Sequence, residues 1–348
     1  MKPAGAPQNS SGRNARITDL TPPISKFTAD DGTVYHLERV IGKGGYGMVY
    51  ACSTDSGLYC ALKTAKEYSL NIEVEVLKKV NEKKCRHFCR LLAEGFNAEL
   101  KDAYIVMEIL GPNFVEVRNM LPTRRFTLQT SLRVSMQMLN SIEELHEAGF
   151  ISRDVKPSNF VVGSRFPACR VVHMIDFGIA KKIFDANGEL LRRRWNGGWR
   201  GTGRYCSLAN HMKKDQCRRD DLESWLYVTS EVMKGKLPWT NISRYERELL
   251  CEAKRSIRNK ARENFFMKLP KFMSVILTLI DGWSFTTKPD YQKIYDLFDE
   301  EMKRQKFDYT APYDWEDCPI FAAMKKTSTA TASIDDSTST VSTLSVGK

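Results

Sequence analysis

Residues 151–160 read ISRDVKPSNF, and within this stretch Asp154, Lys156 and Asn159 stand at the spacing D-x-K-x-x-N. These side chains suit the transfer of a phosphoryl group to a hydroxyl. A carboxylate can orient the hydroxyl and accept its proton, an ammonium group can neutralise the phosphoryl oxygens, and an amide oxygen can bind a metal ion. The stretch therefore predicts Asp154, Lys156 and Asn159 as catalytic residues, with Asn159 also a metal ligand.

A second acidic motif follows at 173–180, where HMIDFGIA places Asp176 behind an apolar strand and before Phe177 and Gly178. A carboxylate here can bridge Mg²⁺ to nucleotide phosphates, because hard cations prefer oxygen ligands. Asp176 is therefore predicted to bind the nucleotide through Mg²⁺, beside Asn159.

A glycine-rich stretch at 41–50, IGKGGYGMVY, contains Gly42, Gly44 and Gly47, with Val49 two residues after the last glycine. This spacing also fits a dinucleotide-binding turn, which needs a helix directly after it, or a plain tight turn. A strand-like sequence, VYACS, follows instead. The pattern favours a hairpin over nucleotide phosphates, where glycines let backbone amides approach closely.

Downstream of the glycines, YCALK at 59–63 places Ala61 and Lys63 in the pattern of a strand lysine that binds phosphate oxygens. Such a lysine needs a carboxylate partner, and NIEVEVLKKVNEKK at 71–84 offers two. Glu73 precedes apolar residues by three, four and seven positions, whereas Glu75 shares its helical side with charged residues. Glu73 is therefore predicted to face inward and Glu75 to face solvent.

Taken together and in this order, the motifs resemble those of the protein kinases. Within them, the chain resembles the casein kinase 1 group, in particular its tau-tubulin kinase-like branch. The resemblance covers about residues 34–316. It is carried by these motifs: MEILGPNF at 107–114, KPSNF at 156–160, GWRGTGRYCS at 198–207, RRDDLESW at 218–225, LPW at 237–239 and TKPDYQKI at 287–294.

The resemblance implies an α+β fold with two lobes, a small β-rich N-lobe with one regulatory helix and a larger helical C-lobe, and ATP in the cleft. It implies Met107 as gatekeeper, with Glu108 and Leu110 in the hinge. Lys156 looks like the version of its loop found in Ser/Thr kinases, so transfer to Ser or Thr is expected. By the same likeness, Asp221 would hold the catalytic loop from a buried helix.

The expected organisation has three parts: an N-terminal extension at 1–27, a kinase domain at 28–322 and a Ser/Thr-rich tail at 323–348, both ends disordered because they lack a hydrophobic period. The N-lobe is expected at about 28–110 and the C-lobe at about 111–322. Strands are expected within 34–62 and at 102–110. Helices are expected at 128–149, 220–235, 245–258, 270–281 and 290–305.

The 348-residue chain has 53 Lys and Arg against 42 Asp and Glu, a formal charge of +11 that suits acidic, phosphorylated, nucleic-acid or anionic-membrane partners. Nine cysteines without paired metal spacing indicate a reducing cytoplasmic or nuclear setting. The longest apolar run, near 274–281, is too short to span a membrane. Cys85, His87 and Cys89 lie close enough for a metal site, but packing is the favoured interpretation.

Substrate recognition is expected from arginines, because guanidinium groups bind carboxylates and phosphates bidentately. Arg200 and Arg204 flank GTG in the stretch that resembles the group's anion-binding segment. Further basic residues are expected to approach: Arg192 to Arg194, Arg244, Arg247, Lys254 and Arg255. The expected partners are acidic or phosphorylated protein substrates, with a cytoskeletal partner suggested by the family resemblance. No nucleic acid or membrane partner is expected, and the chain is expected to be a monomer.

Two departures from the family pattern, together with the composition of the activation segment, bear on activity. Ser152 replaces the family His that stacks beneath the D-F-G Phe, so looser packing under Phe177 is expected. Ala209 in CSLANH stands where the group has Asn, which puts the anchoring of that segment in doubt. The activation segment, 178–201, contains no Ser, Thr or Tyr between its end glycines, so activity is expected without phosphorylation there.

The favoured hypothesis is an active Ser/Thr kinase that uses ATP and Mg²⁺. A weakly active or inactive scaffold that binds acidic or phosphorylated partners is the alternative. A nucleic-acid or microtubule binder led by the basic charge is a third hypothesis. An inactive scaffold predicts loss at one of the catalytic positions, and all of these keep the expected residue types: Lys63, Asp154, Asn159 and Asp176.

Overall fold

The computed structural model describes residues 21–44, 47–97 and 101–322. The chain divides into two compact units, which are treated separately below. Unit 1 comprises Met1–Leu70 and Leu92–Ile109, and unit 2 comprises Asn71–Leu91 and Leu110–Lys348. The expected tail at 323–348 and most of the expected N-terminal extension lie outside the described residues.

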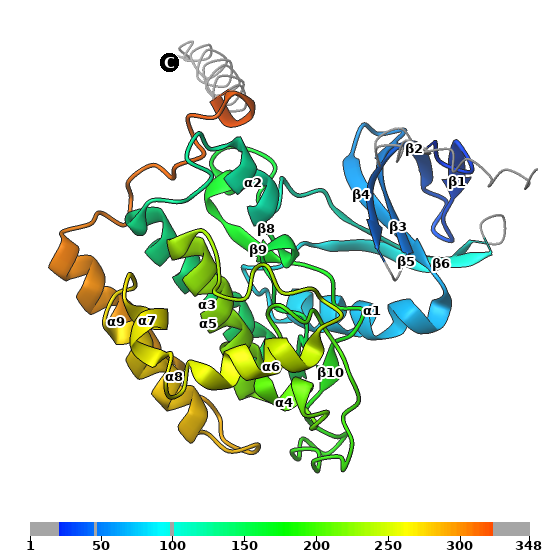
Figure 1. The fold of residues 1–348 in the computed structure, drawn as a ribbon. Coiled ribbons are helices and arrows are strands. Elements are labelled where there is room, and N and C mark those ends of the chain that lie inside the picture. Colours follow the sequence, from blue (N-terminus) through cyan, green and yellow to red (C-terminus); the bar gives the residue numbers. More distant parts are fainter. Residues whose placement is uncertain (1–20, 45–46, 98–100, 323–348) are drawn as a thin grey trace, which may run out of the picture. The chain divides into compact units, whose positions relative to one another are not determined.

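Unit 1 contains a six-stranded sheet with the strand order β1-β2-β3-β4-β6-β5 (Figure 1). The strands are β1 (Lys26–Thr28), β2 (Val34–Gly44), β3 (Gly47–Thr54), β4 (Tyr59–Ala65), β5 (Leu91–Asn97) and β6 (Asp102–Glu108). Its core is built from aromatic and β-branched side chains that favour a pleated surface, among them Tyr35, Val40, Tyr50 and Val106. Both expected strand regions are present, whereas β1 and β5 were not predicted.

Strand β1 corrects the expected start of the folded domain. Phe27, placed in the disordered extension, is 3% exposed, and its ring stacks on Tyr35 at a centroid distance of 5.4 Å. Lys26 and Phe27 pair with β2 at His36 and Tyr35. The ordered sheet therefore begins before residue 28, because the aromatic side chain of Phe27 closes the core.

The glycine-rich stretch forms a hairpin between β2 and β3, although residues 45 and 46 lie outside the described part. The chain continues as strand β3 and not as a helix, which excludes the dinucleotide-binding turn. Gly47 has a φ of +144°, and a Cβ atom there would lie 2.0 Å from the carbonyl oxygen of Thr64 on β4. Only glycine fits at this position, because the neighbouring strand backbone occupies the space of a side chain.

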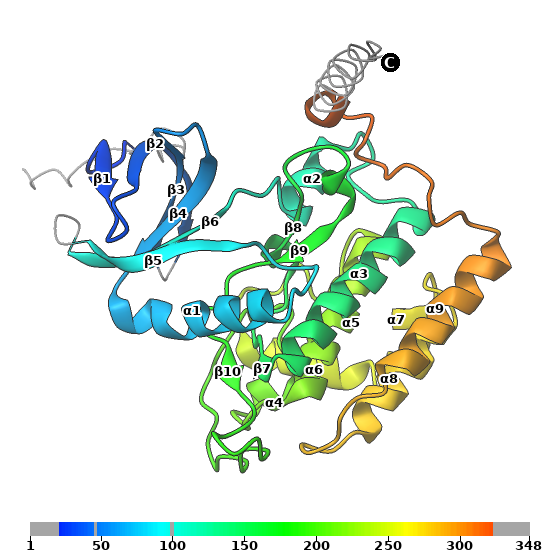
Figure 2. The same ribbon diagram turned by 180° about the vertical axis from the view of Figure 1, so that it is seen from behind.

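Unit 2 is mainly helical, and helix α1 (Glu67–Glu82) runs from unit 1 into it. Figures 1 and 2 show α3 and α5 side by side, with α8 and α9 beside them. The helices that follow α1 are α2 (Phe114–Met120), α3 (Leu128–Glu147), α4 (Leu208–His211), α5 (Arg218–Lys234), α6 (Arg247–Ser256), α7 (Arg262–Phe266), α8 (Phe272–Gly282) and α9 (Tyr291–Gln305). Its short strands are β7 (Phe150–Ile151), β8 (Phe160–Val162), β9 (Val172–Met174) and β10 (Lys181–Lys182).

The five predicted C-lobe helices correspond to α3, α5, α6, α8 and α9, with every end within two residues of the prediction. Gly149 directly follows the C-cap of α3 and has a φ of +93°, as expected for a glycine that ends a helix. The short helices α2, α4 and α7 were not predicted. They span two turns or less, too few residues for a periodic pattern to appear.

Helix α5 is buried over most of its length, and the indole of Trp225 donates a 3.0 Å hydrogen bond to the carbonyl oxygen of Ser135 on α3. A helix buried on all sides is ordinarily apolar. This one also buries four carboxylates: Asp220, Asp221, Glu223 and Glu231. Buried carboxylates require hydrogen-bond partners, so the loops around α5 are held by side chains of this helix.

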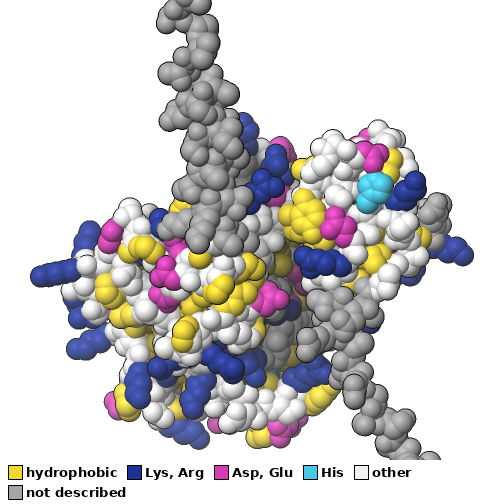
Figure 3. Space-filling view, turned by 90° about the horizontal axis from the view of Figure 1, so that it is seen from above, with side chains coloured by type: hydrophobic (Ala, Val, Ile, Leu, Met, Phe, Trp, Pro, Cys, Tyr) yellow, Lys and Arg dark blue, Asp and Glu magenta, His cyan; other side chains and the backbone are white. Residues whose placement is uncertain are grey.

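The surface matches the composition in a simple way. Lys and Arg side chains are spread over the face seen in Figure 3, with Asp and Glu between them. None of the helices in the described ranges is long and apolar enough to cross a bilayer. All nine cysteines are free thiols.

Candidate active site

The loop after β7 holds Asp154 in a fixed orientation. Lys156 Nζ donates to Asp154 Oδ2 at 2.6 Å, and Thr202 Oγ1 donates to Asp154 Oδ1 at 2.7 Å. Asp154 itself is 8% exposed. Because a donor lies against each oxygen, the orientation of the carboxylate is fixed before any ligand binds. The structure thus brings the predicted Asp154 and Lys156 together, and it adds Thr202, for which no role was predicted from the sequence.

Asn159 lies close to the strand end that leads to Asp176. Its Nδ2 donates to the carbonyl oxygen of Asp154 at 3.0 Å, and its own carbonyl oxygen accepts from the backbone N–H of Ile175 at 3.0 Å. Strands β8 and β9 pair with Phe160 opposite Met174, so the two chain segments meet at the same end of this hairpin. The topology therefore places Asn159 beside the residues next to Asp176.

The chemistry of these two residues fits Mg²⁺. The amide nitrogen of Asn159 donates to the carbonyl oxygen of Asp154, so the side-chain oxygen Oδ1 can bind another group. Oxygen atoms are the ligands that Mg²⁺ prefers. Among the described residues, no group of three or more His, Cys, Asp or Glu side chains could hold a metal ion. Two protein oxygens plus phosphate oxygens are a usual set for Mg²⁺ bound with a nucleotide.

Asp221 on α5 holds the backbone of the catalytic loop. Its Oδ2 accepts from the backbone N–H of Ser152 at 2.7 Å, and its Oδ1 accepts from the backbone N–H of Arg153 at 2.9 Å. A ring nitrogen of His146 lies 3.0 Å from Asp221 Oδ2, and the other ring nitrogen lies 2.6 Å from the Tyr291 hydroxyl. Arg153 has a φ of +65°, which these contacts stabilise. The expected role of Asp221 is confirmed.

In unit 1, strand register places the predicted nucleotide-binding residues on one face of the sheet. Residues directly opposite each other in an antiparallel ladder point to the same side. Gly42 pairs with Val49, Val49 with Lys63, and Ala61 with Met107. Ala61 and Lys63 are two residues apart and so share a face. The five positions from four strands therefore form one surface of unit 1.

The remaining predicted residues are found as follows. Gly44 is the last residue of β2, and Glu108 is the last residue of β6, where it pairs with Cys60. Leu110 is the first residue of the second segment of unit 2. Glu73 on α1 is 3% exposed, whereas the side chain of Glu75 is 47% exposed and pairs with Lys182 at 3.0 Å. Helical spacing therefore chose correctly between the two glutamates.

Ser152 and Phe177 both lie in the interior of unit 2. Both residues are 1% exposed, and the ring of Phe88 lies 5.6 Å from that of Phe177. Ser152 Oγ accepts from the backbone N–H of Asp154 at 3.2 Å. Phe88 thus packs against the Phe177 ring, and the serine hydroxyl supports the loop that carries Asp154. The looser packing expected between Ser152 and Phe177 stays a prediction.

Replacing Ser152 tests this account. Ser152→Ala should lower the free energy of unfolding by about 0.5–1.5 kcal/mol through loss of one buried hydrogen bond. Ser152→His should lower it by about 1–3 kcal/mol, because the imidazole is larger than the buried serine side chain that it replaces and overpacks its site. Urea denaturation measures both, with Ser158→Ala in the same loop as control. A Ser152→His variant more stable than wild type would show that the site of Ser152 has room for an imidazole ring.

Arg204 is the better supported of the two predicted anion-binding residues. Its guanidinium donates to the carbonyl oxygen of Thr240 at 3.0 Å and lies 3.9 Å from the buried carboxylate of Glu231, yet its side chain remains 40% exposed. Glu231 also accepts from the hydroxyl of Tyr205 at 2.7 Å. These contacts fix the guanidinium while part of it still faces solvent.

A pocket of about 230 Å³ lies beside Arg204. It is lined by Thr202, Arg204, Tyr205, Ile242, Arg244 and Leu250. Thr202 lines this pocket and also contacts Asp154, so the pocket adjoins the candidate catalytic carboxylate. Arg200 is not among the lining residues, and its Nη1 donates to the carbonyl oxygen of Trp199 at 2.9 Å.

Lys254 is a correction to the expected basic surface. It is fully buried, and its Nζ donates to the carbonyl oxygens of Gly203 at 2.7 Å and Cys206 at 2.6 Å. Burial lowers the pKa of its ammonium group. Lys254 therefore binds the backbone on either side of Arg204 from the interior of the protein. It does not contact an anion at the surface.

The other basic residues are divided. Arg247 stacks on the ring of Trp199 at 4.2 Å, and Arg194 forms an ion pair with Asp215 at 2.8 Å, so neither guanidinium is fully available to a substrate.

Ala209 is buried in α4, where the following Asn210 is also buried and accepts from the backbone N–H of Arg200 at 3.0 Å. Asn210 thus anchors the segment whose anchoring the Ala209 replacement put in doubt.

His87 makes contacts with the backbone that suit the packing role favoured from the sequence for Cys85, His87 and Cys89. A ring nitrogen of His87 lies 2.7 Å from the carbonyl oxygen of Val172, and the carbonyl oxygen of His87 accepts from the backbone N–H of Met174 at 2.9 Å. Burial lowers the pKa of His87. The segment extends the edge of the β8–β9 hairpin.

Comparison with known proteins gives consistent matches. The sequence model described as "Protein kinase domain" matches residues 35–280. The chain is 35% identical over 247 residues to Serine/threonine-protein kinase spe-6 of Caenorhabditis elegans, which covers 70% of this chain and 64% of that protein. It is 31% identical over 283 residues to a "Probable serine/threonine-protein kinase" of Dictyostelium discoideum, covering 80% of this chain and 55% of that protein. The matched part thus spans less than two thirds of either relative.

Proposed function

This chain belongs to the protein kinase domain family, and from that premise we propose that it transfers the γ-phosphate of ATP to Ser or Thr side chains of protein substrates. The observation that carries the proposal is the double-anchored carboxylate of Asp154, with Lys156 and Thr202 against its two oxygens. The relatives whose names describe serine/threonine-protein kinases support the choice of acceptor.

In the proposed reaction, the substrate hydroxyl oxygen attacks the γ-phosphorus while the bond to the bridging oxygen of ADP breaks. Asp154 orients the hydroxyl and accepts its proton as the new P–O bond forms. Lys156 neutralises charge on the transferred phosphoryl oxygens. Thr202 keeps the carboxylate in position and adjoins the substrate pocket.

For nucleotide binding, we assign the shared face of unit 1, with Lys63 as the phosphate-binding lysine and Met107, Glu108 and Leu110 at the base. Asn159 and Asp176 would hold Mg²⁺, which neutralises phosphate charge when bound. Glu73 is assigned as the carboxylate that supports Lys63. These roles are carried over from the family motifs at matching positions.

Transfer to a generic acidic protein tests the proposal. Wild-type protein incubated with ATP, Mg²⁺ and casein should label Ser and Thr, and Asp176→Ala should leave only background. Equal signals from both proteins would favour the alternative, a scaffold that binds acidic or phosphorylated partners without transfer. A nucleic-acid binder would instead show binding that weakens steeply with salt while the ATP site is blocked.

Within the family, we propose membership of the casein kinase 1 group and its tau-tubulin kinase-like branch, supported by the motifs at 107–114, 198–207 and 218–225. The proposal includes a monomer in the reducing cytoplasm or nucleus, which the nine free thiols support. It also includes preference for acidic or phosphorylated substrates, supported by the partly exposed Arg204 beside the pocket.

Arg204→Ala tests the substrate preference. The variant should raise KM for an acidic or phosphorylated peptide by about 10- to 150-fold, since a charge-assisted contact contributes about 1.5–3 kcal/mol, and it should change KM for a neutral peptide little. Arg165→Ala, an exposed arginine outside the pocket, is the matched control. Equal effects on both peptides would show that Arg204 supports the fold and does not recognise an anionic group of the substrate.

A further inference from the structure

Asp215 is a buried carboxylate outside the motifs discussed so far. It lies between α4 and α5, and its side chain is 0% exposed. Asp215 Oδ2 accepts from Lys181 Nζ at 2.7 Å and from the backbone N–H of Arg194 at 3.0 Å. Asp215 Oδ1 accepts from Arg194 Nη2 at 2.8 Å and from Arg194 Nε at 3.2 Å. One carboxylate thus receives four hydrogen bonds from two residues of the activation segment.

The two partners stand at separate points of that segment. Lys181 lies on β10 and pairs with Ile151 on β7, directly before the catalytic loop. Arg194 lies in the middle of the segment, and the neighbouring Gln216 Nε2 lies 3.5 Å from the carbonyl oxygen of Arg200 near its end. Asp215 and Gln216 therefore fasten the segment at its start, middle and end to the body of unit 2.

Positive charge is concentrated around this carboxylate. Burial together with the nearby Arg194 and Arg200 lowers the pKa of Arg153 to about 10. The guanidinium of Arg153 donates to the carbonyl oxygens of Ile179 and Ala180. Burial alone would raise the pKa of Asp215, but hydrogen bonds from Arg194 and Lys181 outweigh it and lower the pKa to about 2. Asp215 is therefore ionised at neutral pH and balances cations that otherwise repel one another.

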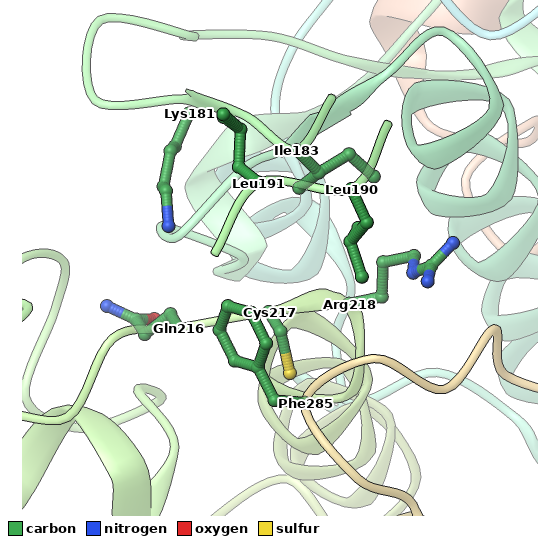
Figure 4. A pocket seen from close by; sticks show the side chains of 8 residues that line it. All are labelled: Lys181, Ile183, Leu190, Leu191, Gln216, Cys217, Arg218 and Phe285. Carbon is green, nitrogen blue, oxygen red and sulfur yellow. The ribbon is translucent and has the colours of Figure 1, made fainter. Parts of the chain in front are cut away.

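Apolar residues lie beside the Lys181 half of this ion pair, whereas the side chain of Arg194 is 52% exposed. Figure 4 shows Lys181, Gln216 and Phe285 around a small pocket of about 10 Å³, together with Leu190 and Leu191. Lys181 Nζ and Arg193 Cζ each lie 5.8 Å from the centre of the Phe285 ring. A partly dry environment strengthens the attraction between the carboxylate and its cations.

The end of the segment reaches the catalytic loop. Gly201 has a φ of +98°, and a Cβ atom there would lie 2.2 Å from the carbonyl oxygen of Arg153. The next residue, Thr202, donates to Asp154 Oδ1. The position of the segment therefore decides whether Thr202 reaches Asp154.

We propose that Asp215 is a positioning residue that orders the activation segment through its charge. The negative charge of its carboxylate replaces that of a phosphate group, which the segment cannot carry. No Ser, Thr or Tyr stands between Gly178 and Gly201 to accept a phosphate. The negative charge comes instead from outside the segment, from a carboxylate that is always present. This inference rests on the proposed kinase activity and extends it to the basal state of the enzyme.

Charge rescue tests the inference. Asp215→Ala should lower kcat about 100-fold, the size of effect expected when a reacting group is misplaced, with little change in KM for ATP. Added formate, a small carboxylate, should restore a large part of the rate, whereas formamide, its neutral analogue, should not. Lys181→Met should lower kcat similarly and should not respond to formate. Equal rescue by formate and formamide would overturn the charge-based role.

Hydrogen exchange of the full-length protein gives a readout independent of activity. The backbone N–H of Arg194 should be protected in the wild type, exchange freely in Asp215→Ala and be protected again with formate. If wild type shows no transfer to casein, the proposed function fails, while exchange still decides the role of Asp215. Phosphatase-treated wild type should retain its rate. A rate lost on this treatment and restored by modification within 179–200 would overturn the inference, as would unchanged exchange in Asp215→Ala.

Discussion

Asp154→Asn is expected to lower kcat for peptide phosphorylation about 100- to 10,000-fold, the range that a positioned general base contributes. Asparagine keeps the shape of the side chain and can still accept a hydrogen bond from Thr202, but it cannot take a proton from the substrate. Lys156 would also lose its ion pair, which measures 2.6 Å in the structure. The loss should therefore fall on the chemical step and not on nucleotide binding.

Single-turnover kinetics together with the Kd for ATP separate these two steps. The Kd for ATP should change little, because the assigned phosphate ligands remain. Asp185→Asn, which changes an exposed carboxylate of the activation segment, is the matched control and should leave the rate near that of wild type. A rate for Asp154→Asn within about tenfold of wild type would remove Asp154 from the role of base.

Local periodicity predicted the parts of the site that lie on regular elements. Glu73 was chosen over Glu75 from helical spacing alone, and the structure buries the first and exposes the second. The D-x-K-x-x-N spacing likewise placed Asp154 and Lys156 within a hydrogen bond of each other. In both cases the residues are close in sequence, so helix or loop geometry decides their positions.

Residues held by distant partners were not predictable in this way. Lys254 was expected to approach the anion-binding segment as a free cation, yet it is buried and donates hydrogen bonds to two carbonyl oxygens some fifty positions earlier. Asp215 follows two lysines in KKDQ, which reads as a solvated charge run. Phe88 supports Phe177 from 89 positions away, a pairing that no local pattern contains. These contacts depend on tertiary packing, which overrides the local preference of each residue.

Asp221→Ala is expected to lower the free energy of unfolding by about 3–5 kcal/mol, the cost of removing one partner from a buried charged network. The residue is 1% exposed and accepts from the backbone N–H groups of Ser152 and Arg153. Without the carboxylate, both groups stay buried and unsatisfied, at about 1–3 kcal/mol each. Asp221→Asn should be destabilising as well, since one amide cannot accept both bonds in the same geometry. Urea denaturation measures the change, with the exposed Asp296→Ala as control.

The same carboxylate should also affect catalysis, because the two N–H groups it binds belong to the loop that carries Asp154. Arg153 keeps a φ of +65°, a left-handed conformation that few non-glycine residues adopt without support. Once the two bonds are lost, this peptide can relax and Asp154 moves away from Thr202. In an assay without urea, at a temperature where Asp221→Asn remains folded, kcat should therefore fall well below that of wild type. A variant that is less stable but retains the wild-type kcat in its folded fraction would show that Asp221 supports the fold alone and that other contacts orient the loop.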